Sequence, residues 1–394
     1  MRAEALSSPL ASRSSPVAVE SMREVISVDV KAHIKHLAET IGPRGSCTAA
    51  ERDAALYAES YLAGLGFQTA QQAFRSLTTF SWLHICFFWW PMVAWVFGNV
   101  WLGFLGTVLF FLDLNTIPVL SRLFPTGRSQ NVIAKHSGQG VKVVLVAHLD
   151  SSKAGLNFSP ALVKGFRTSF LLMAWSFISS PVLLGASRWL GGYWRIAALI
   201  PALYLAFASL TLIHREFWNK YTPGANDNAS GVAAVLEAAA RLKDYAGVEL
   251  TVLLTGAEEA GTYGMARFLS LHGSDYRDAY FINLDNIGSG RLHYMRGEGM
   301  FPVFKATPAL IQACDKVAAR RSDLGVTPGV YTLLSTDAMP ALVRGYKAVS
   351  FLAISEEGLL PNWHWPTDTA DNVDVATVES AVEFVVELVR GLGE

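Results

Sequence analysis

The chain has 394 residues, which is enough for one large domain or two of ordinary size. Its formal net charge is −1, so no overall basic field indicates a nucleic-acid partner. Hydrophobic residues make up 51% of the chain and charged residues only 16%, against about 25% in ordinary soluble domains, and this deficit of charge indicates contact with lipid.

The N-terminal residues and the cysteines point to neither secretion nor a thiolate site. Residues 1–25 are rich in Ser and Ala and lack an apolar core of signal-peptide length, so we expect a flexible tail. Cys47, Cys86 and Cys314 are scattered, odd in number and not in C-x-x-C spacing. We therefore predict no disulfide framework and no cysteine zinc site.

Hydrophobic periodicity predicts helices that alternate with strands along most of the chain. A helix over 28–41 stops at Gly42-Pro43, and Gly66 follows a second helix. The strand over 141–147 is almost wholly apolar, as a buried parallel strand should be. The fold class we predict is α/β, with a mostly parallel central sheet flanked by helices. The other predicted elements are helices over 50–65, 229–242, 262–271 and from about 375, and strands over 131–135, 248–255, 279–284 and 348–354.

Two apolar segments, 80–123 and 166–214, interrupt this pattern, and we predict that each is a transmembrane helical hairpin. No charge occurs between Arg75 and Asp113, and each half of a hairpin approaches the 20 or so apolar residues that a spanning helix needs. The turns are expected at Gly98-Asn99 and Gly191-Gly192. Tryptophans suited to interfacial belts occur at positions 82, 89, 90, 95, 101, 175, 189 and 194. The alternative is a pair of hairpins buried in a soluble dimer interface.

The hairpins divide the chain and constrain its topology. A zinc peptidase domain is predicted over 26–79, 124–165 and 215–394, all on one side of the membrane. The basic residues near that side are Arg75, Arg122, Arg128, Lys164, Arg167, Arg215 and Lys220, whereas the opposite side has only Arg188 and Arg195. The positive-inside rule then predicts an integral membrane protein with four transmembrane helices and a cytoplasmic catalytic domain. Because both hairpins return to the same face, the active site should lie close to the membrane, which favours small or membrane-associated peptides as substrates.

Metal-binding side chains follow several of the predicted strands. The strand over 141–147 ends at His148, with Asp150 placed to hold the second ring nitrogen, and other donors follow at Glu258-Glu259 and Asp285. Asp227 lies in a turn rich in small residues, where it could instead cap the next helix, and His364 lies in an aromatic, Pro-containing loop, where it could simply be packed. Histidine and carboxylate ligands without thiolate suit zinc, and a bridging carboxylate would hold two ions about 3.5–4 Å apart.

In this order the motifs resemble the family of zinc aminopeptidases that also includes glutamate carboxypeptidases and glutaminyl cyclases. The matching segments are His148-x-Asp150, GANDNASG around Asp227, Glu258-Glu259, Asp285 and HWPTDT from His364. Ile41-Gly42-Pro43-Arg44 and Ser335-Thr336-Asp337 resemble further parts of the family. Two features depart from the pattern: Ala338 stands where the family often has His, and no motif places the family's oxyanion-stabilising tyrosine, for which Tyr331 is the candidate.

The resemblance implies two Zn²⁺ ions and a role for each residue. His148 and Asp285 would bind one ion, Glu259 and His364 the other, and Asp227 would bridge both. Glu258 would be the general base and later the acid, acting with a zinc-bridging hydroxide, and Asp150 would support His148. The candidate substrate-binding residues are Tyr331, Asp337 and Trp363.

The predicted function is a membrane-integrated metallopeptidase that removes N-terminal residues from peptides. Its partners would be a peptide substrate and the lipid bilayer, with an oligomer possible. Three alternatives stay open: a carboxypeptidase, dipeptidase or other amide hydrolase on the same site, an acyltransferase like glutaminyl cyclase, and a non-catalytic membrane scaffold.

Overall fold

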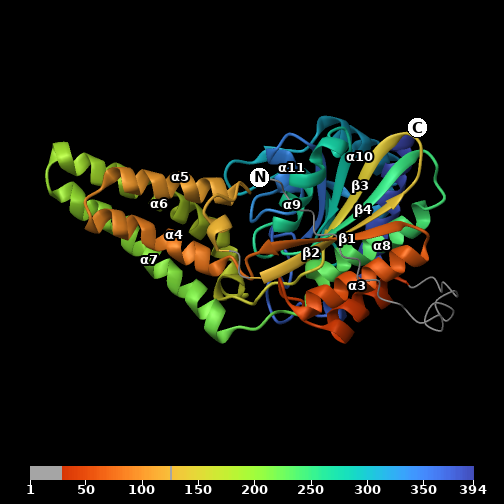
Figure 1. The fold of residues 1–394 in the computed structure, drawn as a ribbon, viewed down its shortest axis with the longest axis horizontal. Helices are drawn as coiled ribbons and strands as arrows, with labels where there is room; N and C mark the ends of the chain where they lie inside the picture. The colour runs from red at the N-terminus through yellow and green to blue at the C-terminus, as the bar shows by residue number, and fades with distance from the viewer. Residues whose placement is uncertain (1–28, 125–126) are drawn as a thin grey trace, which may run out of the picture.

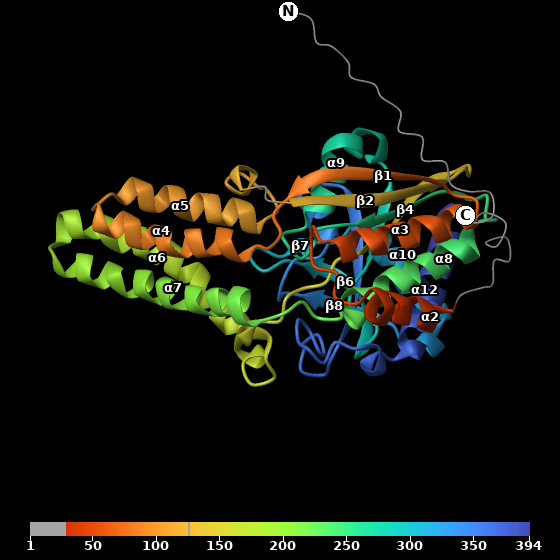
Figure 2. The same ribbon diagram turned by 60° about the horizontal axis from the view of Figure 1, so that its bottom comes forward.

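The computed structural model describes residues 29–124 and 127–394, so the tail predicted over 1–25 lies outside the described residues. An α/β unit carries a helical bundle that projects from one end of it (Figures 1 and 2).

One mixed sheet forms the centre of the α/β unit, in the order β1-β2-β4-β3-β5-β9-β6-β7, with β8 paired to β6. The four central strands β4, β3, β5 and β9 are parallel, as predicted, whereas β1, β2 and β6 pair antiparallel at the edges, which the sequence pattern did not predict. The strands are β1 (Gln68–Ser76), β2 (Gly127–His136), β3 (Val141–His148), β4 (Val248–Thr255), β5 (Tyr280–Leu284), β6 (Arg291–Glu298), β7 (Phe304–Lys305), β8 (Thr327–Tyr331) and β9 (Lys347–Ile354).

Helices cover both faces of the sheet, and strand β3 shows how the layers form. Val143, Leu145 and Ala147 share a core with α2, α3, α8, α10 and α12, whereas Val144 and Val146 pack with α9 and α11 on the opposite face. These helices are α2 (Val30–Lys35), α3 (Ala49–Gly64), α8 (Gly231–Leu242), α9 (Tyr263–His272), α10 (Pro308–Arg320), α11 (Ala338–Val343) and α12 (Val375–Gly393). The remaining elements are short 3-10 or π-helical segments: η1 (His36–Ile41), η2 (Ser121–Leu123), η3 (Leu156–Phe158), η4 (Val163–Gly165), η5 (Ala225–Ser230), η6 (Gly273–Tyr276), η7 (Ser322–Leu324) and η8 (Ala370–Asn372).

The two predicted hairpins form the projecting bundle. It contains α4 (Ser81–Val96), α5 (Val100–Leu114), α6 (Phe166–Leu190) and α7 (Tyr193–Trp218). The first hairpin turns at Gly98, where φ is +59°, and the Asn99 side chain then accepts a hydrogen bond from the Leu102 N–H to cap α5. Small residues allow close packing, because a Cβ on Gly106 would lie 2.2 Å from the Trp90 ring.

Two helices of the bundle are long and apolar enough to cross a membrane, Val163–Leu190 and Tyr193–Trp218. The first hairpin differs from expectation, because α4 and α5 have only 16 and 15 residues. Both are shorter than the 20 or so residues of a typical span.

The bundle adjoins the end of the sheet where ligands are expected. Strand β1 ends at Ser76 and α4 begins at Ser81, so the carboxyl end of β1 faces the bundle. Because β2 is antiparallel to both β1 and β4, strands β4 and β3 run in the same direction as β1. The carboxyl ends of the parallel strands therefore point toward the bundle (Figure 1).

Candidate metal centre

Separate segments bring the predicted donors together at the carboxyl ends of the parallel strands. His148 is the last residue of β3, Asp285 follows β5 directly, and Glu258-Glu259 follow the end of β4. Asp227 lies in η5 ahead of α8, and His364 lies in the loop after β9. His148 is 1% exposed, and the other five side chains are 3% to 9% exposed.

Asp227 does not cap α8, which its position had left as an alternative. The Asn228 Oδ1 atom accepts the hydrogen bond from the Gly231 N–H, 3.0 Å away, at the start of α8. A side chain on Gly231 would collide with that oxygen and with the Leu284 carbonyl. The Asp227 carboxylate is therefore free to face the two histidines.

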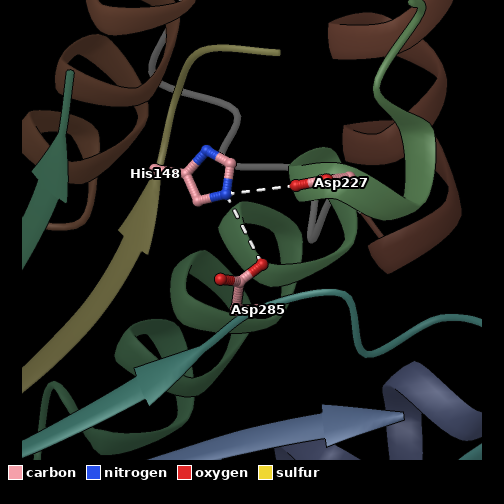
Figure 3. A group of neighbouring side chains, drawn as sticks. All are labelled: His148, Asp227 and Asp285. Atoms are coloured by element: carbon pink, nitrogen blue, oxygen red, sulfur yellow. Dashed lines mark ion pairs between the residues drawn. The ribbon is translucent and has the colours of Figure 1, made fainter. Parts of the chain in front are cut away.

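The first donor group consists of His148, Asp227 and Asp285, which Figure 3 shows converging on one ring nitrogen. The His148 Nε2 atom lies 3.2 Å from Asp227 Oδ1 and 3.4 Å from Asp285 Oδ1. On the other side of the ring, Nδ1 lies 3.0 Å from the main-chain oxygen of Asp150. Because a carbonyl oxygen only accepts, Nδ1 carries a proton, and Nε2 is the ring nitrogen that faces the two carboxylates.

The second group consists of Asp227, Glu259 and His364. The His364 Nε2 atom lies 3.0 Å from Asp227 Oδ2 and 3.1 Å from Glu259 Oε2. The two oxygens of Asp227 thus face different histidines. Glu259 Oε1 is buried and has no hydrogen-bond partner among the described residues.

The electrostatics of the site require positive charge at both nitrogens. Burial alone would lower the pKa of each histidine, but the carboxylates outweigh it, raising the pKa of His148 well above its usual value and that of His364 to about 9. Buried carboxylates of this density are stable only beside cations or protons. Two imidazoles and three carboxylates, without thiolate, form a donor set that fits zinc.

Glu258 lies beside the donor groups but belongs to neither. Burial raises the pKa of its carboxyl well above the usual value; His148 opposes this rise, whereas Asp337, Glu259 and Asp285 add to it. A carboxyl group of raised pKa next to the ligands is suited to accept and return a proton.

The structure changes the role expected for the Asp150 side chain. Its carboxylate is 3.7 Å from His148 Nδ1, and the ring is held instead by the Asp150 main-chain oxygen. The carboxylate oxygens accept hydrogen bonds from the backbone N–H groups of Glu258 and Glu259, each at 3.1 Å. Asp150 therefore anchors the loop that presents the base and a ligand.

A supporting layer of buried polar residues was not assigned a role from the sequence. Glu51 accepts from the Ala257 N–H at 2.8 Å, and Asp368 accepts from the Asn226 N–H at 2.6 Å. Arg44 is 1% exposed and donates to the carbonyls of Leu149 and Gly224, which joins the loops of His148 and Asp227. These three residues lie in segments that the sequence analysis singled out, but their hydrogen-bond partners belong to distant segments and could not be read from the sequence.

The three candidate substrate-binding residues lie near the donors in different ways. Tyr331 is 3% exposed, and burial raises the pKa of its phenol well above the usual value, with Asp285 and Asp227 adding to this effect. The Asp337 carboxyl accepts a hydrogen bond from the Thr255 hydroxyl, and its Oδ1 atom is buried without a hydrogen-bond partner among the described residues. Trp363 is 4% exposed and packs edge-on against Phe158, so it supports the wall beside His364.

Sequence comparison matches part of the chain to a known family. Residues 211–389 match the profile of peptidase family M28. The chain carries a peptidase family M28 domain. The matched segment of the M28 domain contains Asp227, Glu258, Glu259, Asp285 and His364, whereas His148 precedes it. The predicted class of enzyme, a zinc-dependent metallopeptidase, is thereby confirmed. No curated protein matches the sequence significantly.

Solved structures show the same fold. A zinc aminopeptidase from Bacillus subtilis is 15% identical, with a TM-score of 0.56 over 92% of this chain and 94% of that one. A Zn-dependent exopeptidase from Parabacteroides distasonis is 17% identical, with a TM-score of 0.54 over 92% and 96%. A glutaminyl cyclase from Porphyromonas gingivalis is 15% identical, with a TM-score of 0.56 over 92% and 97%. The predicted zinc-exopeptidase fold is confirmed, but since the neighbours differ in activity, the fold does not choose between their reactions.

Proposed function

We propose that the chain is a membrane-integrated aminopeptidase that uses two zinc ions. The observation that carries the proposal is that Asp227 directs one carboxylate oxygen to His148 and the other to His364. A carboxylate shared between two donor groups is the arrangement expected of a bridging ligand.

In this proposal each donor group holds one ion. His148 and Asp285 would bind the first zinc, Glu259 and His364 the second, and Asp227 would contact both. Zinc bound there supplies a water molecule of lowered pKa and a Lewis acid that polarises the peptide carbonyl.

Glu258 would perform the proton transfers. Its carboxylate takes a proton from water as the peptide carbonyl is attacked and then delivers that proton to the leaving amine. The hydrogen bond from the Glu258 N–H to Asp150 holds this residue in place. The buried phenol of Tyr331 stays protonated and is suited to donate a hydrogen bond to the developing oxyanion.

The charge of the site favours a substrate with a free amino terminus. Glu258 and Asp337 are carboxyls beyond the proposed ligand set, and both lie in the same buried region. Their oxygens can accept hydrogen bonds from the α-ammonium group of a peptide, and a cation beside them favours their ionised form. The proposed reaction is therefore the removal of the N-terminal residue, with Trp363 supporting the wall beside the site.

A peptide library with free amino termini, digested while zinc is counted in the same sample, tests this function. We expect stepwise loss of N-terminal residues, about two zinc ions per chain, and no cleavage of peptides with blocked amino termini. Cleavage of blocked peptides would indicate another amide hydrolase, and conversion of N-terminal Gln into a ring would indicate a cyclase. The Glu258→Gln variant should keep its zinc and lose most turnover, and wild-type activity in it would contradict the assigned base.

The surface of the bundle supports membrane integration by both hairpins. Large apolar side chains are exposed along all four helices, among them Trp101 at 76%, Trp175 at 64% and Phe207 at 70%. Water would disfavour such a surface, whereas lipid would cover it. We therefore propose a catalytic domain of residues 26–79, 124–165 and 215–394 with inserted transmembrane hairpins at 80–123 and 166–214, the first of them shorter than the second.

We further propose that the catalytic domain is cytoplasmic. Arg188 and Arg195 lie together at the tip of the bundle, where they donate to the carbonyls of Gly98 and Trp95. More basic residues, including Arg122, Lys164 and Lys220, lie near the opposite end. The positive-inside rule then assigns that end to the cytoplasm. Protease digestion of the catalytic domain in intact cells would contradict this orientation.

The proposed site lies at the end of the sheet that adjoins the bundle, which favours small or membrane-associated peptides as substrates. Ala257 and Ala260, on either side of Glu258-Glu259, belong to the same apolar cluster as Phe87 of α4 and Phe177 of α6. Efficient trimming of large folded soluble proteins would contradict this substrate class.

A further inference from the structure

Large exposed apolar side chains are concentrated on the bundle and immediately beside it. Within the described residues, the exposed large apolar side chains that lie elsewhere are Leu56, Leu271 and Val330. Eight others lie on three segments next to the base of the bundle, and we call these eight the collar: Ile117, Val119, Leu123, Phe124, Leu156, Leu162, Phe301 and Val303. Their exposure runs from 37% at Leu156 to 75% at Leu123.

The collar surrounds the base of the bundle. The segment 115–124 follows α5 directly, and 156–165 precedes α6 directly. In Figure 2 the first segment lies above the base of the bundle and the second below it. The loop at Phe301 reaches both neighbouring helices, because Asn115 at the end of α5 donates to the Phe301 carbonyl at 3.4 Å and Arg167 of α6 donates to the Met300 carbonyl at 2.9 Å.

The charge of these segments has one sign. Residues 115–124, 156–165 and 299–303 contain Arg122 and Lys164 and no acidic residue. Both basic side chains are exposed, and Lys164 pairs only with the exposed Glu357. Apolar side chains mixed with basic ones, without carboxylates, are the composition of surfaces that enter the headgroup layer of anionic membranes.

We infer that the collar is a lipid-binding surface, through which the catalytic domain rests in the headgroup layer of an anionic bilayer. This inference rests on the proposed membrane integration, because the collar is continuous with α6 and α7. Leu162 lies four residues before α6, and α7 ends with Phe217 and Trp218, which are 67% and 70% exposed. A helix pair that crosses the membrane brings its flanking residues to the headgroup layer, and the collar is the apolar surface at that level.

Nitroxide spin labels on the full chain in vesicles test the collar. The labels are placed by L123C and V303C in the collar, by F207C on the outer surface of α7, and by L271C on the catalytic domain away from the bundle. The background is Cys86→Ala, since Cys86 is the exposed cysteine, and its own labelling is the blank. The vesicles contain phosphatidylcholine with about one-third phosphatidylglycerol, and collisions with oxygen and with a water-soluble nickel chelate report the depth of each label.

We expect the L123C and V303C labels to collide with oxygen several-fold more, relative to the nickel chelate, than the L271C label, and to lie at a depth between L271C and F207C. The contrast should shrink in pure phosphatidylcholine. If the F207C label lies deep in the bilayer while the L123C and V303C labels are as exposed to water as the L271C label, the collar does not bind lipid and the membrane integration stands. If F207C itself is exposed to water, the proposed integration fails. Spin–spin broadening of L123C that disappears on dilution with unlabelled protein, without lipid contact, would assign the collar to a second copy of the chain instead.

Discussion

The Asp150 carboxylate accepts a hydrogen bond from the backbone N–H of Glu258, 3.1 Å away. The other oxygen of the same carboxylate accepts from the next N–H, that of Glu259, and from the Ser46 hydroxyl at 2.6 Å. A side chain that follows one strand thus fixes the backbone that follows another. The proposed base and one proposed ligand are thus held through their backbone N–H groups.

Replacing Asp150 should therefore impair activity without direct loss of a ligand. In Asp150→Ala the two N–H groups lose their acceptor, and we expect a fall of about 10- to 100-fold in kcat/KM, with weaker zinc retention. Ser46→Ala is the matched control, because it removes one bond to the same carboxylate and leaves the loop anchored. Steady-state kinetics and zinc analysis provide the measurement. Equal activity in Asp150→Ala and Ser46→Ala would contradict the anchoring role.

Removing individual ligands should change the number of bound ions in a predictable way. Asp285 belongs to one donor group, whereas Asp227 belongs to both. We expect about one zinc per chain in Asp285→Ala and almost none in Asp227→Ala. Asp278, which is exposed, provides the control variant Asp278→Ala with the wild-type metal content. Atomic emission of purified, dialysed protein measures the number of zinc ions per chain. Two zinc ions retained in Asp227→Ala would show that Asp227 is not a ligand shared by both sites.

Arg215, at the end of α7, should be important for stability. It is 3% exposed and pairs with Glu216 at 3.0 Å, and it donates to the hydroxyls of Ser81 and Ser152. Arg215→Met removes a buried donor from the two hydroxyls and leaves Glu216 with Lys153 as its basic partner. We therefore expect a loss of about 3 kcal/mol in the free energy of unfolding.

Exposed Arg188 is the control for this prediction, because it makes a single hydrogen bond at 3.2 Å. Arg188→Met should cost less than about 1 kcal/mol. Arg215→Lys should be intermediate, since Lys keeps the charge but not the planar donors. Unfolding in detergent micelles, followed by circular dichroism, ranks the three variants. An Arg215→Met protein as stable as Arg188→Met would show that the cluster contributes little.

His33 should make stability depend on pH in the acid range. Burial lowers the pKa of His33 to about 4; Asp29 opposes this effect and His36 adds to it. The ring Nδ1 lies 2.7 Å from the Tyr57 hydroxyl. Because the unfolded chain binds a proton at about pH 6.5 and the folded chain does not, stability falls as the pH drops from 6.5 to 4, by about 3 kcal/mol in total.

The His33→Gln variant should lose this part of the pH dependence. The free energies of unfolding of both proteins are measured between pH 7 and 4 by denaturant titration, and their difference isolates His33 because other groups titrate alike in both. A difference that does not change with pH would mean that His33 is protonated in the folded chain.

The sequence predicted the candidate donors as an ordered set, although each member alone is a weak signal. His148 and Asp285 end almost wholly apolar strands, and the paired acids at Glu258 stand where carboxylates have no ordinary reason to meet. The central strands were predictable because their burial on both faces requires a continuous apolar run. These features depend on neighbours along the chain.

Other features depend on segments that are distant in sequence and gave no such signal. Strand β1 (Gln68–Ser76) is largely polar and half-exposed, so its pattern does not resemble a strand. Glu51 lies in an ordinary helix, and only the folded chain brings it to Ala257, 206 positions later. The first hairpin turns at Gly98, as predicted, but its second helix ends at Leu114 rather than near residue 123, because a composition window does not locate a helix end.

For each helical hairpin, the residues at which the chain leaves and re-enters the catalytic fold lie next to each other. Ser76 and Gly127 are partners in the β1–β2 ladder, and Lys153 pairs with Tyr221 on either side of the second hairpin. The two ends of each insertion are therefore already adjacent, and a short turn could join them without moving a ligand. If the bundle is the proposed membrane attachment, it and the catalytic fold are separable modules, and the same enzyme could be detached from lipid, or attached to it, by exchanging two connections.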